Sequence, residues 1–152
     1  MFVNRSMPSC TVIPVLMYDD VAEAAVWLCE TFGFKERWRA GNHRVQLAVG
    51  DGAVVVTERR VSQGSDSPAS AEPEPPRQGH GCHSVMVRIE DATSHYEHAR
   101  NRGARILHPP TDYPYGERQY TAQDLGGHRW SFSQSIADVA PEEWGGTSAE
   151  IS

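Results

Sequence analysis

Hydrophobic and polar residues follow one another along this chain in an order that occurs twice. Residues 11 to 33 read TVIPVLMYDDVAEAAVWLCETFG, a short apolar run followed by a stretch whose apolar residues recur every three or four positions. That order predicts a strand followed by a one-sided helix. Residues 83 to 103, HSVMVRIEDATSHYEHARNRG, repeat it. The helical stripes are Val21, Ala24, Ala25, Leu28, Cys29 and Phe32 in the first copy and Ala92, His95, Tyr96 and Ala99 in the second.

The ends of the two predicted helices carry matching signals. Asp20 and Asp91 are good N-cap residues, because a short carboxylate accepts hydrogen bonds from the first free backbone N–H groups of a helix. Gly33 and Gly103 supply the left-handed position that ends many helices. The two aspartates lie 71 residues apart and the two glycines 70 residues apart, so the repeat keeps its period.

Three strand-like runs follow each helix. The last two runs of each copy are joined by glycine turns, Gly50-Asp51-Gly52 and Gly126-Gly127, which are strong hairpin signals. Each half therefore reads βαβββ, and the chain is predicted to be an α+β protein of two tandem βαβββ modules. The runs are residues 34–40, 43–50 and 53–58 in the first copy and 104–108, 117–123 and 128–134 in the second.

The division of the chain follows from this repeat. Module one is assigned to residues 10–59 and module two to residues 82–134, with a C-terminal tail at 135–152. Between the modules, residues 60–81 are rich in Pro, Ser, Gly and Glu, which is typical of a flexible tether; a lid over a cleft is the alternative. The 152 residues form a single domain of two such modules.

Composition narrows the class of protein. A net charge of −6 argues against a nucleic-acid partner, which would require clustered basic residues. No apolar run approaches the roughly 20 residues that span a bilayer, and no secretory signal is visible, so the expected compartment is the cytoplasm. A homodimer is expected, since two-fold dimers are the commonest oligomers.

The most specific segment is YGERQYTAQDLGGHRWSFSQ, residues 115 to 134. It resembles the D-P-x-G-H-x-W ending of bacterial members of the vicinal oxygen chelate superfamily, which includes glyoxalase I, extradiol dioxygenases, fosfomycin-inactivating thiol transferases and bleomycin-resistance proteins. Leu125 and Gly126 depart from that pattern but leave the turn intact. The resemblance covers residues 11 to 134. It implies that the modules close a cup of curved mixed β-sheet, with the helices outside and the site on the inner face.

The same resemblance implies four metal-ligand positions, one on the first and one on the last strand of each module. Counting back from the helix caps and forward from the hairpin glycines assigns these positions to Ile13, Val56, Ser84 and Ser131. None of these is a good ligand for a divalent transition metal, so the metal site is predicted to be degenerate and no cofactor is expected. His83 lies one residue out of register. A shifted register that brings His83 and Glu58 into the site is the alternative.

Alternation of side chains along the strands predicts which residues face the inside of the cup. It assigns Val54, Val56 and Glu58 to the inner face, together with Met17 and Met86. The complete set of predicted ligand-binding residues is Met17, Trp38, Gln46, Glu58, Ser84, Met86, Arg88, Tyr120, Arg129 and Ser131.

Such a wall, apolar with a few polar groups, is typical of a small-molecule pocket. The favoured function is a non-catalytic protein of the glyoxalase and bleomycin-resistance type that sequesters a planar or amphiphilic compound. The alternative is a metal-dependent lyase or dioxygenase of the same superfamily with a non-standard site. No membrane partner is expected, and the sequence does not identify the ligand.

Overall fold

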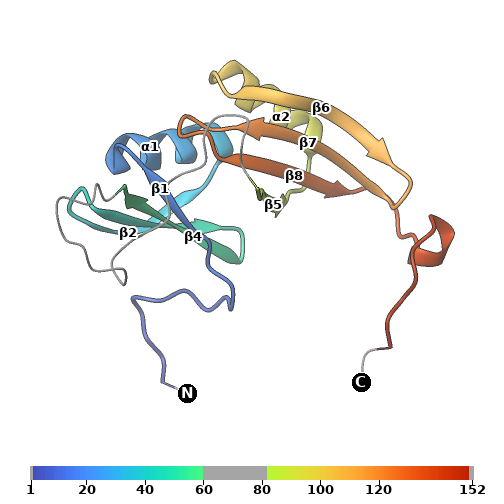
Figure 1. Cartoon of the computed structure of the whole chain (residues 1–152), viewed down its shortest axis with the longest axis horizontal. Coiled ribbons are helices and arrows are strands. Elements are labelled where there is room, and N and C mark those ends of the chain that lie inside the picture. Colours follow the sequence, from blue (N-terminus) through green and yellow to red (C-terminus); the bar gives the residue numbers. More distant parts are fainter. Residues whose placement is uncertain (1, 60–81, 151–152) are drawn as a thin grey trace. The chain divides into compact units, whose positions relative to one another are not determined.

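The computed structural model describes residues 2–59 and 82–150, so the 60–81 segment lies outside the described residues. The described elements are two four-stranded sheets, each with one α-helix, and a short 3-10 helix at Pro141–Glu143 (Figure 1). The order βαβββ therefore occurs twice, and the predicted α+β class is confirmed. The first copy contains β1 (Val15–Tyr18), α1 (Val21–Phe32), β2 (Lys35–Ala40), β3 (Arg44–Val49) and β4 (Gly52–Glu58). The second contains β5 (Val85–Arg88), α2 (Ala92–Asn101), β6 (Arg105–Tyr113), β7 (Glu117–Gln123) and β8 (Arg129–Ser135).

Both helices begin at the predicted caps. Asp20 Oδ1 accepts a hydrogen bond of 3.0 Å from the backbone N–H of Glu23, and Asp91 Oδ1 accepts one of 3.0 Å from Ser94. Gly33 ends α1 with a φ of 82°, a left-handed conformation that a residue without a Cβ adopts at little cost. Neither α1 nor α2, the helices of the described residues, is long and apolar enough to cross a membrane.

The first sheet has the strand order β1-β4-β3-β2, with β1 parallel to β4 and the other pairs antiparallel. Helix α1 packs on one face of β3 and β4. On β1 this covered face is marked by Leu16 and Tyr18, which are buried, whereas Val15 is half exposed. Because Leu16 pairs in register with Val56, and Val56 with Val45, these buried side chains form the core beneath α1.

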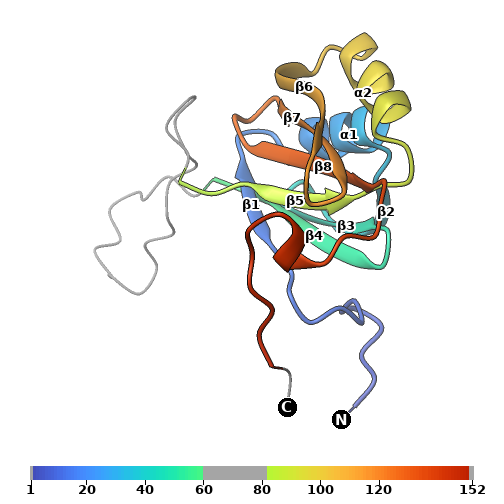
Figure 2. The same ribbon diagram turned by 90° about the vertical axis from the view of Figure 1, so that its right-hand side faces the viewer.

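The second sheet repeats this order as β5-β8-β7-β6, with β5 parallel to β8. Helix α2 lies along one side of it (Figure 2). Beneath the helix, Trp130 and Phe132 of β8 are fully buried, and Phe132 pairs with Tyr120 of β7. The Tyr120 hydroxyl forms a hydrogen bond with Nδ1 of His95 on α2, and the His95 ring lies 4.3 Å from the Phe132 ring. Aromatic packing therefore forms the core of this half.

Strand β6 extends further than the sequence pattern indicates. The expected run, residues 104–108, ended at His108, but β6 continues through Pro109 and Pro110 to Tyr113. The prolines are tolerated because β6 is an edge strand, where a residue without an N–H interrupts no ladder on its outer side. The pairing with β7 is irregular around these residues, so β6 accommodates them through bulges.

Contacts divide the chain into two compact units that do not coincide with its halves. The first unit comprises residues up to His83 together with Asp124–His128, and the second comprises Ser84–Gln123 and residues from Arg129 onward. The β7–β8 turn thus belongs to the first unit. Within that unit, His128 Nε2 donates a hydrogen bond of 2.7 Å to the backbone carbonyl of Met17. This contact gives His128 a structural role, because it ties the β7–β8 turn to β1.

Candidate functional site

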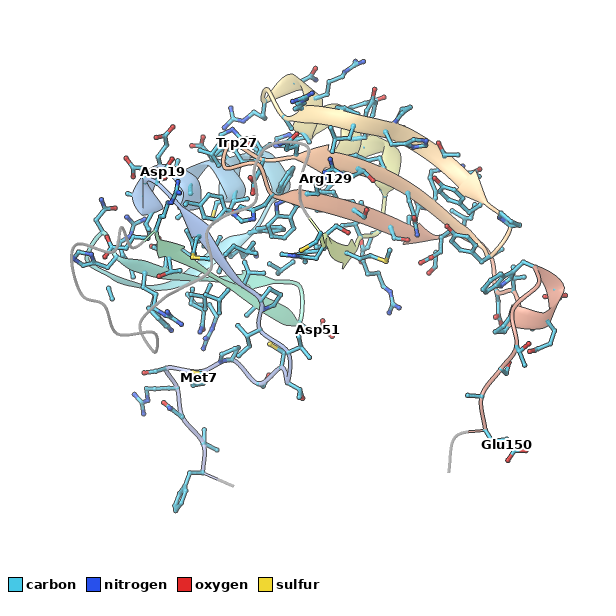
Figure 3. The ribbon with its side chains drawn as sticks, in the orientation of Figure 1. Met7, Asp19, Trp27, Asp51, Arg129 and Glu150 are labelled. Atoms are coloured by element: carbon cyan, nitrogen blue, oxygen red, sulfur yellow. The ribbon has the colours of Figure 1, made fainter. Side chains whose placement is uncertain are left out.

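The face of the second sheet opposite α2 carries the densest group of polar side chains predicted to bind a ligand. Strand pairing places Met86 beside Ser131 and Thr121, and Arg88 beside Ser133 and Gln119. Neighbours in register share a face of the sheet, so these side chains lie together, as the sequence alternation predicted for β5 and β8. Figure 3 draws the side chains of the sheet as sticks and labels Arg129 of β8.

Hydrogen bonds connect the polar groups on this face. Glu117 accepts bonds from the Ser133 hydroxyl at 2.8 Å and from the Gln119 amide at 3.0 Å, one on each carboxylate oxygen. The hydroxyls of Thr121 and Ser131 lie 3.2 Å apart. These bonds hold the side chains in defined orientations and satisfy the one carboxylate among them.

The residues of this face that were not singled out from the sequence include Gln119, Thr121 and Arg105. Gln119 and Thr121 alternate along β7 with the buried Tyr120 and Ala122, and Arg105 lies at the start of β6. A period of two along residues 117–123 was available as a signal, since the buried positions of β7 alternate with more polar ones. The position of Arg105 required the β6–β7 register, which pairs it with Gln123.

The corresponding face of the first sheet, opposite α1, is more apolar. Met17 lies on it. A row of paired residues also crosses this face from β1 to β2, formed by Val15, Val55, Gln46 and Trp38. The side-chain oxygen of the buried Gln46 accepts a hydrogen bond from Arg37. Because Val55 and Gln46 are buried, the more exposed groups of this face are the side chain of Val15, the thioether of Met17 and the indole of Trp38.

The N-terminal segment contacts this face at its edge strand. The indole N–H of Trp38 donates a hydrogen bond of 2.9 Å to the backbone carbonyl of Ser6, and Arg37 donates one of 3.3 Å to the carbonyl of Arg5. The indole donor of Trp38 is thus satisfied within the first unit, and a ligand on this face would contact mainly the ring of Trp38.

The predicted orientation of β4 is wrong. Val56 pairs with Leu16 and Glu58 pairs with Tyr18, so both belong to the face covered by α1, as does Val54. Glu58 lies at the end of that face, where Oε1 is 2.9 Å from Nδ1 of the exposed His43. An ion pair this exposed contributes little to stability.

Different turn lengths explain this error of one residue. In the first hairpin Gly52 already pairs with Val49, whereas in the second hairpin Gly127 lies inside the longer 124–128 turn. Equal counts from the two glycines therefore end on opposite faces. The register gives the equivalence directly: Met86, five residues before Asp91, pairs with Ser131, and Val15, five residues before Asp20, pairs with Val55.

The predicted orientation of Tyr120 is also wrong. Tyr120 is 1% exposed, pairs with Phe132 and bonds to His95 of α2, so its ring lies in the core. Burial raises the pKa of its phenol well above the ordinary value. Its hydroxyl faces the helix, and Thr121 takes the position on the opposite face.

The residues at the metal-ligand positions do not form a set that would hold a divalent transition metal. With the corrected register these positions are Ile13, Val55, Ser84 and Ser131, two aliphatic side chains and two hydroxyls. Zinc, nickel and iron prefer imidazole, thiolate or carboxylate ligands. Over residues 2–59 and 82–150, no three His, Cys, Asp or Glu side chains come close enough to share a metal. His83 is exposed just before β5, with Nδ1 3.6 Å from Cys82 Sγ.

Two βαβββ copies with a D-x-x-G-H-x-W turn are typical of one known class of protein, and a comparison with family models identifies the same class. The model of the Glyoxalase/Bleomycin resistance protein/Dioxygenase superfamily matches residues 11–132. The chain belongs to this superfamily.

Solved structures give relatives within the class. TioX from Micromonospora sp. ML1 is 30% identical with a TM-score of 0.65, and the match covers 84% of this chain and all of TioX. A glyoxalase/bleomycin resistance protein/dioxygenase from Nocardioides is 18% identical with a TM-score of 0.60, covering 89% of each chain. A superfamily member from Sphaerobacter thermophilus is 16% identical with a TM-score of 0.61, covering 83% of this chain and 97% of its own. The last two share the fold alone, and no curated protein matches.

Proposed function

We propose that this protein binds a small organic molecule without catalysing its conversion and without a resident metal. The observation that carries the proposal is the chemistry at the four positions where the superfamily places its ligands. Ile13 and Val55 have no donor atom, and the Ser131 hydroxyl is already within 3.2 Å of another hydroxyl. Two hydroxyls and two aliphatic groups can contact an organic molecule, but they lack the donors for Lewis-acid chemistry.

The side chains around these positions support a planar or amphiphilic ligand. On the first sheet, the Trp38 ring and the thioether of Met17 lie on the face opposite α1. On the second sheet, considered by itself, Met86 is 60% exposed and lies beside the polar groups opposite α2. Unbranched methionine side chains adapt to ligands of different shapes, and aromatic rings stack on flat ones. Sequestration of such a compound is the role we propose.

Metal content separates this proposal from its alternative. The purified full chain, analysed by inductively coupled plasma mass spectrometry, is expected to contain only trace nickel, zinc, iron or manganese. A thermal-shift screen of planar and amphiphilic compounds is expected to yield ligands that raise the melting temperature. About one equivalent of tightly bound transition metal per chain would overturn the proposal. It would favour a metal-dependent lyase or dioxygenase of the same superfamily.

We also propose that the protein acts as a homodimer in the cytoplasm, without nucleic-acid or membrane partners. Two-fold dimers are the commonest oligomers of soluble proteins, and the net charge of −6 disfavours nucleic acid. Light scattering at micromolar concentration is expected to give the mass of two chains. The mass of one chain would refute the dimer and leave the binding function to be tested separately.

A further inference from the structure

Two arginines flank a buried glutamine on the face of the second sheet opposite α2. Arg105 of β6 pairs with Gln123 of β7, and Gln123 pairs with Arg129 of β8. The three residues therefore form one row across three strands. Neighbouring strands lie about 4.8 Å apart, so the two arginine backbones are roughly 10 Å apart, close enough for their long side chains to reach one anion.

A third arginine lies on the same face. Arg88 of β5 is exposed and pairs with Ser133, two rows further along β8. In the described part of the chain, none of these three guanidinium groups forms an ion pair with a carboxylate. This contrasts with Arg118 on the opposite face of β7, whose guanidinium bonds to Asp112 at 2.6 Å.

The single carboxylate of this face does not neutralise the arginine row. Glu117 lies six residues along β7 from Gln123, roughly 20 Å away. Both of its oxygens accept bonds from Ser133 and Gln119. The row formed by Arg105 and Arg129 thus carries net positive charge in a chain whose overall charge is −6. Guanidinium groups are also the preferred donors for carboxylate, sulfonate and phosphate oxygens.

We infer that the ligand carries an anionic group, which Arg105 and Arg129 bind while its apolar part contacts the same face of the second sheet. This inference rests on the proposed small-molecule binding and assigns the ligand to a chemical class, an organic anion with a flat or aliphatic body. Arg105 is the residue that the strand register adds to those predicted from the sequence.

A series of naphthalene probes that differ only in charge tests the inference. The probes are 2-naphthalenesulfonate, 2-naphthalenemethanol and 2-naphthylmethylammonium, each titrated by calorimetry into the full chain at pH 7. The wild type is expected to bind the sulfonate at least about tenfold more tightly than the ammonium probe, as charge-assisted hydrogen bonds allow. The affinity for the sulfonate is expected to fall with added NaCl, and the affinity for the alcohol to stay constant.

Variants test whether Arg105 and Arg129 are responsible for the preference for the sulfonate. The double variant Arg105→Gln/Arg129→Gln is expected to lose the preference for the sulfonate while keeping its affinity for the alcohol. Arg118→Gln removes one positive charge, half the change in the double variant, from the other face of the same sheet, and this control is expected to keep the preference. Thermal unfolding of each variant confirms that it is folded.

The outcomes separate the two proposals. Binding of the alcohol or the ammonium probe without preference for the sulfonate overturns the anionic ligand and leaves small-molecule binding standing. A loss in Arg118→Gln of about half that in the double variant, or more, also overturns it, because the effect would then follow net charge alone. Absence of binding for all three probes counts against the proposed function itself.

Discussion

Replacing Asp124 with alanine should be among the most destabilising single changes in the first unit. Its carboxylate is buried and accepts three hydrogen bonds, from the Tyr18 hydroxyl at 2.5 Å, from the Gly126 N–H at 2.9 Å and from the His128 N–H at 3.0 Å. Alanine leaves the hydroxyl of Tyr18, a residue that is only 2% exposed, without this acceptor. It also frees the two N–H groups that shape the turn.

The expected loss follows from these contacts. A hydrogen bond to a charged group contributes about 1.5–3 kcal/mol, and contributions within one network are not additive. We therefore expect Asp124→Ala to lower the free energy of unfolding by about 3–5 kcal/mol. Tyr18→Phe removes only one of the three donors, and the expected cost is about 1–2 kcal/mol.

Urea denaturation followed by circular dichroism measures both values, provided that the slope of free energy against urea concentration is the same for each variant. Asp112→Ala is the matched control, since it removes an exposed aspartate that bonds to Arg118, and its midpoint should stay at the wild-type value. A loss for Asp124→Ala no larger than that for Tyr18→Phe would refute the reasoning. It would mean that the bonds to the turn contribute nothing to stability.

Three further predictions test other parts of the structure. Val87 pairs with the fully buried Phe132, so Val87→Glu should lower the free energy of unfolding by about 2–4 kcal/mol, whereas Met86 is 60% exposed and Met86→Glu should leave the urea midpoint unchanged. The reverse result would mean that the two faces of β5 are exchanged. Burial, with the nearby Asp124 charge, raises the pKa of Tyr18, so the contribution of Tyr18 to stability is fully present below about pH 10 and declines above it. The Tyr18→Phe variant should therefore lose less stability at alkaline pH than the wild type, and an identical decline would contradict this assignment. Gly116→Ala drives a Cβ into the backbone carbonyl oxygen of Ala137 at a φ of +85°, so we expect a drop in thermal midpoint that corresponds to about 1–3 kcal/mol. An unchanged midpoint would exclude that conformation.

Local signals in the sequence were sufficient for the order of elements. Asp20 and Asp91 cap helices because a carboxylate one position before a helix reaches N–H groups only three residues away. The glycine turns and the apolar stripes act over similarly short distances. The alternation on β5 and β8 was also readable, since Val87 and Phe132 are apolar where their neighbours Arg88 and Ser133 are polar.

The orientation of β4 could not be read in this way. Its residues Ala53, Val54, Val55 and Val56 are all apolar and all buried, so the run contains no alternation from which to choose a face. The choice is made by the parallel pairing with β1, which places Leu16 beside Val56. Pairing between strands about 40 residues apart in the chain depends on the whole sheet and leaves no local signal.

The network around Asp124 separates most clearly what the local sequence determines from what the tertiary structure decides. The sequence determined that residues 124–128 form a turn, because Gly127 supplies a positive φ and Asp124 accepts the N–H bonds of its own loop. It gave no sign that Tyr18, 106 residues earlier, would donate its hydroxyl to the same carboxylate. The row of Arg105, Gln123 and Arg129 arises likewise from strand register alone. Each short segment determines its own backbone conformation, whereas the tertiary packing decides which distant side chains become neighbours.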